Sequence, residues 1–265
     1  MKLFAAPVLG FTAAIALVGS SAEAAGNANG FGEKGQLIIS ADRLVPLFGY
    51  ASASVTRTEN GRELTDSTSG AGLSILLGRD LGINGGAGPA NVHTLPRVAF
   101  DYSVINHLTL GAAIAFGFGL GGSIEQEQVQ GNTVTTRKID SPTSSAIGLA
   151  PRVGYVIPLG DWLAFWPRAG FAFYAVSTKF EQTTGNNAVS TVSTTDTLFA
   201  LDLDPQLTIT PTEHFFFHAG PLVNIPLTGS RSLQSTTGGT TTTTNADASV
   251  FHLGLVAGIG GWFSL

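Results

Sequence analysis

Arginine and aspartate side chains recur at alternate positions inside apolar segments, where an unpaired charge would be costly. Opposite charges that share a confined interior should pair, and the guanidinium group of arginine suits two-pronged contacts with carboxylates. We therefore predict a buried ion-pair network whose role is structural, neutralising charge and fixing strand register; a functional gate is the alternative. Its predicted members are Asp42, Arg97, Asp101, Arg152, Arg168, Asp202 and Asp204.

The five histidines are the other candidates for chemistry. A hydrolase would need one of them beside a serine and an acid. His218 and His252 are predicted to face inward on neighbouring strands, but at different heights, so we do not expect them to pair. The chain has no cysteine, which excludes a thiolate nucleophile, a cysteine-bound metal and a disulfide scaffold. We predict no catalytic residue, metal site or cofactor, and hence a protein that is not an enzyme.

The composition restricts where these residues can lie. Charged residues make up 12% of the 265 residues, against roughly 25% in an average soluble domain. Much of the surface is therefore expected not to face water. The formal net charge is -5, and without clustered positive charge nucleic acid is excluded as a partner.

The N-terminus has the pattern of a secretory signal. Lys2 is followed by an apolar stretch over 3–18 and by the small-residue cleavage site Ala22-Glu23-Ala24. The apolar stretch is short for a membrane helix, the alternative, which needs about 20 residues. We predict a signal peptide over 1–24, an N-terminal segment over 25–34 and a single β-barrel over 35–265.

The remaining chain alternates with period two, which is typical of strands. Over 108–121 one face carries large apolar side chains and the other carries glycine and alanine. A soluble β-sandwich, a further alternative, would carry bulky polar residues on its outward face. Charges follow the small residues, as expected if the other face contacts lipid, where an arginine or lysine costs about 2–4 kcal/mol. The pattern predicts an apolar exterior around a narrow interior lined by small residues.

The spacing of the turns predicts a transmembrane, antiparallel, up-and-down β-barrel of about eight strands. Short turns alternate with long polar stretches near 123–143, 181–195 and 229–248, as in outer-membrane barrels with both termini in the periplasm. Parts of these stretches, 183–195 and 235–245, are expected to be mobile. Ten strands is the alternative, because 73–77 resembles a strand inside what is otherwise one long loop over 57–93. Prolines inside strands argue against the model unless they mark bulges; they are Pro96, Pro151, Pro167, Pro205 and Pro221. Three of them, Pro96, Pro151 and Pro167, are directly followed by arginine, and we expect a bulge at a similar depth at these three sites.

The chain ends with Gly260, Phe263 and Leu265 in the spacing Gly-x-x-Phe-x-Leu. This ending resembles the C-terminal assembly signal of bacterial outer-membrane barrels, although those most often end in phenylalanine. The chain as a whole is similar to the small outer-membrane barrels of the OmpA-like, OmpX-like and OmpW-like type. The resemblance implies a location in the bacterial outer membrane, with membrane lipid and the barrel-assembly machinery as partners. No surface partner is identified.

An eight-stranded barrel is only wide enough for its own side chains or one small ligand. We predict a plugged, charge-lined lumen and a structural or surface-interaction role for a monomer or weak oligomer. The glycines over 111–121 suggest an alternative, a narrow conduit for small hydrophobic solutes, and a lipid-modifying enzyme using His218 or His252 is a second. Aromatic residues expected to form an interface girdle at the lower rim are Tyr155, Trp162, Phe165 and Trp166.

Overall fold

The computed structural model describes residues 30–59, 61–73, 89–119, 123–130, 133–140, 142–184 and 188–265. The predicted signal peptide lies outside these residues. The 3-10 helix η4 spans Pro89–Thr94, and no helix in the described part of the chain is long and apolar enough to cross a membrane. The strands are β1 Gln36–Glu59, β2 Arg62–Leu73, β3 Arg97–Ile105, β4 Leu108–Gly119, β5 Ser123–Gln130, β6 Thr133–Asp140, β7 Thr143–Tyr155, β8 Ile157–Pro158, β9 Leu163–Trp166, β10 Arg168–Thr184, β11 Ala188–Leu203, β12 Gln206–Thr212, β13 Phe215–Thr237 and β14 Thr240–Ser264.

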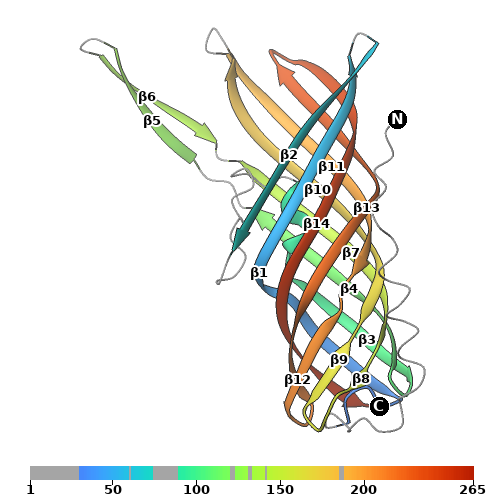
Figure 1. Ribbon diagram of the computed structural model, residues 1–265. Coiled ribbons are helices and arrows are strands. Elements are labelled where there is room, and N and C mark those ends of the chain that lie inside the picture. The colour runs from blue at the N-terminus through green and yellow to red at the C-terminus, as the bar shows by residue number, and fades with distance from the viewer. Residues whose placement is uncertain are drawn as a thin grey trace.

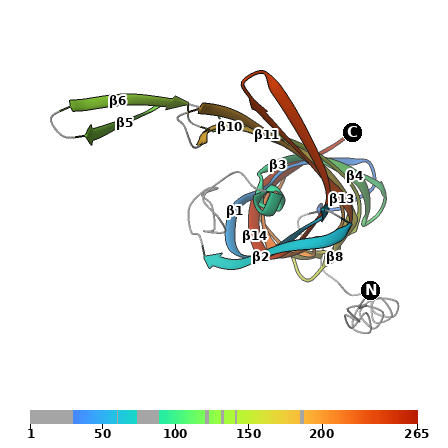
Figure 2. The same cartoon turned by 90° about the horizontal axis from the view of Figure 1, so that it is seen from above.

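Eight strands close into a ring, in the order β1, β3, β4, β7, β10, β11, β13 and β14, with β14 pairing back to β1. Every pairing in the ring is antiparallel. Near the end that holds the C-terminus, β9 precedes β10 and β12 follows β11 (Figure 1). The predicted all-β, up-and-down barrel of eight strands is confirmed. Figure 2 shows η4 inside the ring.

The outside of the barrel is apolar and the inside is not. Residues of β3 alternate between buried and exposed along the strand, and Phe100 is 46% exposed while its neighbours Ala99 and Asp101 are buried. Arg97 and Arg168 are buried as well. A soluble sandwich would bury its phenylalanines and expose its arginines, so that alternative is wrong. An exposed apolar belt of this kind is typical of a barrel surrounded by hydrocarbon.

Several strands are far longer than the roughly 9–11 residues that cross a membrane. β13 has 23 residues and β14 has 25, and they stay paired up to Thr237 and Thr240. The prediction of mobile stretches over 183–195 and 235–245 is therefore wrong wherever these residues are described, because they continue the strands as hairpins (Figure 1). Their many threonines are β-branched and favour extended backbone.

The segment 57–93 is not one long loop either. Residues of β2 pair along the upper half of β1, from Glu59 opposite Arg62 to Phe48 opposite Leu73. Among the described strands β2 pairs with β1 alone. It pairs with residues 48–59 of β1, beyond the residues that pair with β3, and is not a member of the closed ring. The stretch 73–77, on which the alternative of ten strands rested, lies outside the described residues from 74 onward.

The prolines act differently from the repeat of bulges that the sequence suggested. Pro167 separates β9 from β10 and Pro205 separates β11 from β12. The two breaks lie side by side, since the backbone N–H groups of Arg168 and Asp204 each donate to the other residue's carbonyl. Pro151, however, continues the pairing of β7 with β4 without a register shift. The prediction of one bulge at each Pro-Arg site is therefore wrong.

Candidate functional site

A bulge in β1 brings two successive charged residues into the lumen. The register of β1 against β14 shifts between Ala41 and Val45, and Arg43 has a left-handed backbone with a φ of 59°. Even-numbered residues are buried up to Asp42 and again at Pro46, while within the bulge Arg43 is buried as well. A second register shift, between Pro46 and Phe48, moves burial to the odd-numbered Gly49 and Ala51. Asp42 and Arg43 are both buried as a result of the bulge.

Sequence reasoning missed Arg43 because strict alternation places it on the lipid-facing side of the strand. A signal was available, however. An arginine facing lipid costs about 2–4 kcal/mol, so a charge on the wrong parity of a strand favours a local register change over exposure to hydrocarbon.

Asp42 is the hub of the lower half of the charge network. Arg152 and Arg168 both donate to it, the latter from Nη1 to Oδ1 at 3.4 Å. Arg152 also holds Asp101 in a two-pronged contact, with Nε to Oδ1 at 2.9 Å and Nη2 to Oδ2 at 2.5 Å. The Oγ of Ser40 donates to Asp42 Oδ1 at 2.7 Å. These groups come from β1, β3, β7 and β10, so the network ties together opposite sides of the ring.

Asp202 and Asp204 are the acceptors in the other half of the charge network. Arg97 donates from Nη1 to Asp202 Oδ2 at 2.6 Å and from Nη2 to Asp204 Oδ2 at 2.9 Å. Arg168 Nη2 reaches the same Asp204 oxygen at 2.7 Å, which joins the two halves. Arg43 completes the set through Asp202 Oδ2, at 3.0 Å from its Nη2.

The structure therefore brings together all seven residues predicted for the network and adds Arg43 as an eighth. Four arginines face four aspartates, and all eight are buried. Taking a charge out of water is costly, and it is offset only where good geometry and further hydrogen bonds satisfy the ions. Here the amide groups of Gln206 and Asn224 supply additional donors to Asp204 and Asp202.

An aromatic layer lies directly below the charges. Phe31, from the segment before β1, contacts the rings of Trp166, Phe216 and Trp262 at centroid distances of 5.3, 5.1 and 5.2 Å. The Arg168 guanidinium lies 4.6 Å from the centroid of Trp166, a cation–π distance. The placement of Trp166 in an interface girdle is thus wrong, because it is fully buried in the lumen.

Phe31 is held in place by its own chain. Gln36 accepts a hydrogen bond from the backbone N–H of Gly32 at 2.8 Å and donates one to the carbonyl of Gly30 at 2.7 Å. Both glycines have positive φ, a conformation that glycine adopts without steric cost. The segment 30–36 is therefore a tightly closed turn that carries an aromatic side chain into the base of the barrel.

A third layer, mostly apolar, lies above the charges. Arg43 Nη1 donates to the carbonyl of His93 in η4 at 2.6 Å and to the Tyr174 hydroxyl at 3.0 Å, which anchors the helix inside the ring. The rings of His93 and His252 stack at 5.8 Å. Glycines on the inner wall make room for these groups: a Cβ on Gly148 would lie 2.5 Å from the Tyr174 ring, and one on Gly117 would lie 3.1 Å from Leu95. The space predicted as a conduit along 111–121 is occupied at Gly117 by Leu95.

Ser40, Asp42 and His218 lie together, but not in the order of a nucleophilic triad. Nε2 of His218 lies 3.2 Å from Asp42 Oδ1, the oxygen that also accepts the Ser40 hydroxyl. In a nucleophilic triad the histidine stands between the serine and the acid, whereas here the acid stands between the other two. His107 and His214 occupy tight turns with positive φ. Among the described residues, no group of three or more His, Cys, Asp or Glu side chains is arranged to hold a metal ion.

The residues of the predicted assembly signal lie at the end of β14. Gly260 packs against the lumen aromatic Phe216, since a Cβ there would lie 2.4 Å from the ring. Phe263 and Leu265 are 54% and 84% exposed. Their recognition by the assembly machinery stays a prediction.

Comparisons with known proteins return similar structures only. No family model matches the chain, and no curated protein matches it. The outer membrane protein OprG from Pseudomonas aeruginosa is 13% identical over 88% of this chain and 98% of its own, with a TM-score of 0.47. Ail, the attachment invasion locus protein of Yersinia pestis, is 13% identical over 87% and 100%, with a TM-score of 0.32. The outer membrane protease OmpT from Escherichia coli is 9% identical over 86% and 97%, with a TM-score of 0.37.

Proposed function

We propose that this protein is a bacterial outer-membrane barrel with a plugged lumen and a structural or surface-interaction role rather than an enzymatic one. The observation that carries the proposal is the network of four arginines and four aspartates that joins opposite sides of the lumen. Aromatic rings lie below this network and η4 lies above it. An ion would therefore meet three successive barriers.

The middle barrier is the strongest. An ion passing through would have to displace at least one arginine from its carboxylate inside a low-dielectric interior. Breaking a buried pair costs about 3–5 kcal/mol. In this network Asp42, Asp202 and Asp204 each contact more than one side chain. Steady ion flow through the resting barrel is therefore not expected.

The two ends of the barrel support an orientation with both termini in the periplasm. One end has short turns, at Asn106-His107 and Glu213-His214, and the other has the long hairpins of β10 with β11 and β13 with β14. Outer-membrane barrels have short periplasmic turns and long extracellular loops, so both termini are assigned to the periplasm. The hairpins then stand on the outer surface, where segments on a rigid scaffold commonly carry recognition.

The test is a conductance measurement in planar bilayers with the purified full chain. Wild-type protein should give no steady current, whereas the combined variant Phe31→Ala, Arg43→Ala and Arg97→Ala, if it folds, should give measurable current, because it removes the centre of the aromatic layer, the anchor of η4 and two members of the network. Asp196→Ala is the matched control. It removes a partner of Arg231 on the upper wall, at 2.6 Å, and should leave the barrel closed. Large steady currents through wild-type protein would contradict the plug.

The conduit for small hydrophobic solutes is kept as a second candidate because of one observation. β3 begins at Arg97, so β4 beyond Ala115 has no partner on that side among the described strands, while β1 pairs with β2 instead. The layer behind this part of the wall is apolar. Uptake of an apolar fluorophore into vesicles, faster with the protein than without it and without any ionic current, would favour the conduit over the plug.

A further inference from the structure

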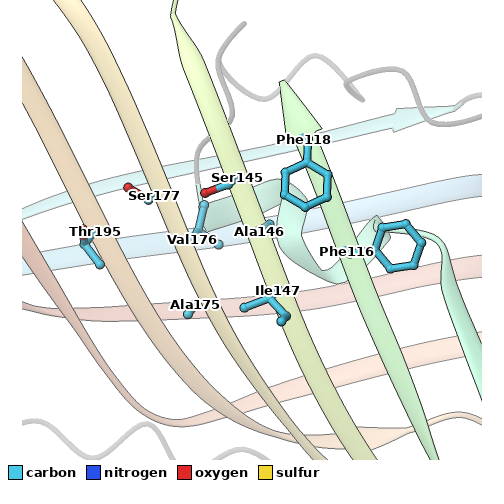
Figure 3. Close-up of a pocket in the computed structure, with 9 residues that line it drawn as sticks. All are labelled: Phe116, Phe118, Ser145, Ala146, Ile147, Ala175, Val176, Ser177 and Thr195. Carbon is cyan, nitrogen blue, oxygen red and sulfur yellow. The ribbon is translucent and has the colours of Figure 1, made fainter. Parts of the chain in front are cut away.

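A groove of about 340 Å³ lies in the outer wall of the barrel, over β4, β7, β10 and β11 (Figure 3). Phe116 and Phe118 of β4 form one side, and Ile147 of β7 lies next to them. The three side chains are 56%, 72% and 62% exposed. A volume of a few hundred Å³ is in the range of small-molecule sites. Seven of the nine lining residues are on the outward faces of their strands, and Ala146 and Val176 are the two exceptions.

The groove arises from a change in side-chain size between successive rows of the sheet. In the row below it, Leu149 pairs with Phe173 and Phe173 with Phe199, so three large side chains cover the wall. In the next row up, Phe173 is followed on the outward face of β10 by Ala175, opposite Ile147. The small side chain of Ala175 therefore leaves a hollow in the outer wall beside the large side chains of Ile147 and Phe116.

The upper part of the groove carries hydroxyl groups. Ser145, Ser177 and Thr195 are direct neighbours across β7, β10 and β11, and Phe118 pairs with Ser145 at the end of this row. The outward face of the wall thus changes from apolar side chains to hydroxyl groups at this row, which is the change expected where hydrocarbon gives way to polar head groups.

A positive charge lies directly above the hydroxyl row. Lys179 follows Ser177 on the outward face of β10 and is exposed. Among the residues that the structure describes, no carboxylate lies within ion-pair distance of Lys179. Glu181, two residues further along the same face, is the nearest acidic residue on this strand.

The geometry points to a binding site for one phosphorylated glycolipid of the surrounding leaflet. Its acyl chain lies against Phe116, Ile147 and Ala175, its sugar faces the hydroxyls, and its phosphate contacts Lys179. A long lysine side chain reaches the head-group level from a strand near the interface, and one such charge contributes about 1 kcal/mol toward an anionic lipid. A glycerophospholipid fits less well, because its compact head group offers few partners to three hydroxyls. The choice of this lipid rests on the orientation given under the proposed function.

Lipid retention by the purified full chain in nanodiscs tests the site, with bound lipid counted by native mass spectrometry. The probes are diphosphorylated lipid A, the same lipid without phosphates, and phosphatidylglycerol. Wild-type protein should retain one diphosphorylated lipid A in preference to the other two. Ala175→Trp fills the groove and should abolish this retention. Lys179→Gln should weaken it about fivefold, the equivalent of 1 kcal/mol, and should leave binding of the phosphate-free lipid unchanged.

The matched control is Ala219→Trp, which places the same side chain on the outer face of β13, opposite Leu207 and outside the groove. Equal lipid retention by Ala175→Trp and Ala219→Trp would overturn the proposal, and so would equal retention of phosphatidylglycerol and lipid A by wild-type protein. Heat-dependent gel mobility checks that each variant is folded, and Ser177→Tyr replaces Ala175→Trp if the latter does not fold. Protease accessibility of the hairpins in intact cells tests the orientation separately.

Discussion

The two halves of the barrel use the same strands but are held together by different interactions. In β14, burial alternates from Ala248 to the C-terminal end, whereas the residues from Thr240 to Asp247 are nearly all exposed. The lower half encloses charged and aromatic layers. The upper part of this strand pairs with β13 alone, from Thr240 opposite Thr237 to Ala246 opposite Arg231, and its side chains form isolated contacts such as Thr236 with Thr241 at 2.9 Å.

The lower half holds the closed barrel together, whereas the upper half extends its strands as hairpins. Lower side chains are ordered by partners from several strands at once, so a change at one of them disturbs many others. Upper side chains contact only their neighbours across one strand pair, and water can replace a lost partner. We therefore expect the effect of a substitution to depend more on its height in the barrel than on its chemical type.

The largest effect is expected at Asp42, the hub of the lower network. Asp42→Ala leaves Arg152, Arg168 and His218 without a shared acceptor, and an uncompensated buried charge costs about 3–5 kcal/mol. The free energy of unfolding in lipid vesicles, measured by urea titration, should fall by about that amount. Asp196→Ala, an aspartate of the upper half, is the control. A loss at Asp42 no larger than at Asp196 would show that the network adds nothing to stability.

The second effect tests the aromatic layer, which lies in the same half but has no charge. Phe31→Ala removes the ring that contacts Trp166, Phe216 and Trp262, and truncating a buried phenylalanine costs about 3–5 kcal/mol. We expect the lower end of this range, because Phe31 precedes the first strand and the ring of strands does not depend on it. The same urea titration measures the loss. If Phe31→Ala matches wild type, the segment before β1 does not contribute to the closed base.

Most of the lower half could be predicted from the sequence, because every lower strand alternates between lipid and lumen. Parity alone placed Arg97, Arg152 and Asp202 inside. It failed at Arg43, where a bulge brings a residue of the lipid-facing parity into the lumen, and at Trp166, whose apolar ring is as compatible with an interface as with a lumen. The charge on the wrong parity was a signal for the bulge, whereas the neighbours of a ring are not a property of local sequence.

The upper half was harder to predict for a different reason. Runs such as Thr240 to Thr244 are polar on both faces, so period-two alternation carries no signal there. Period-two alternation does not predict the pairing of β2 with β1 either. A loop of the same length would connect β1 to β3 equally well, so the connection did not require another strand. The candidate groove depends on four strands meeting in one register, and single-strand patterns do not contain that information.

The smallest effect is expected at the one ion pair of the upper wall that resembles the lower network in chemistry. Arg231 Nε lies 2.6 Å from Asp196 Oδ1, and Nη2 lies 3.1 Å from Oδ2, so the contact is as well formed as those of Arg97. The arginine side chain is 25% exposed, however, against 1% for Arg97. A double-mutant cycle of Arg231→Ala and Asp196→Ala should therefore give a coupling of about 0.2–1 kcal/mol, the range of exposed pairs. A coupling above about 3 kcal/mol, the range of buried pairs, would show that the upper wall is as dry as the lower lumen. In that case height in the barrel would not decide the effect of a substitution.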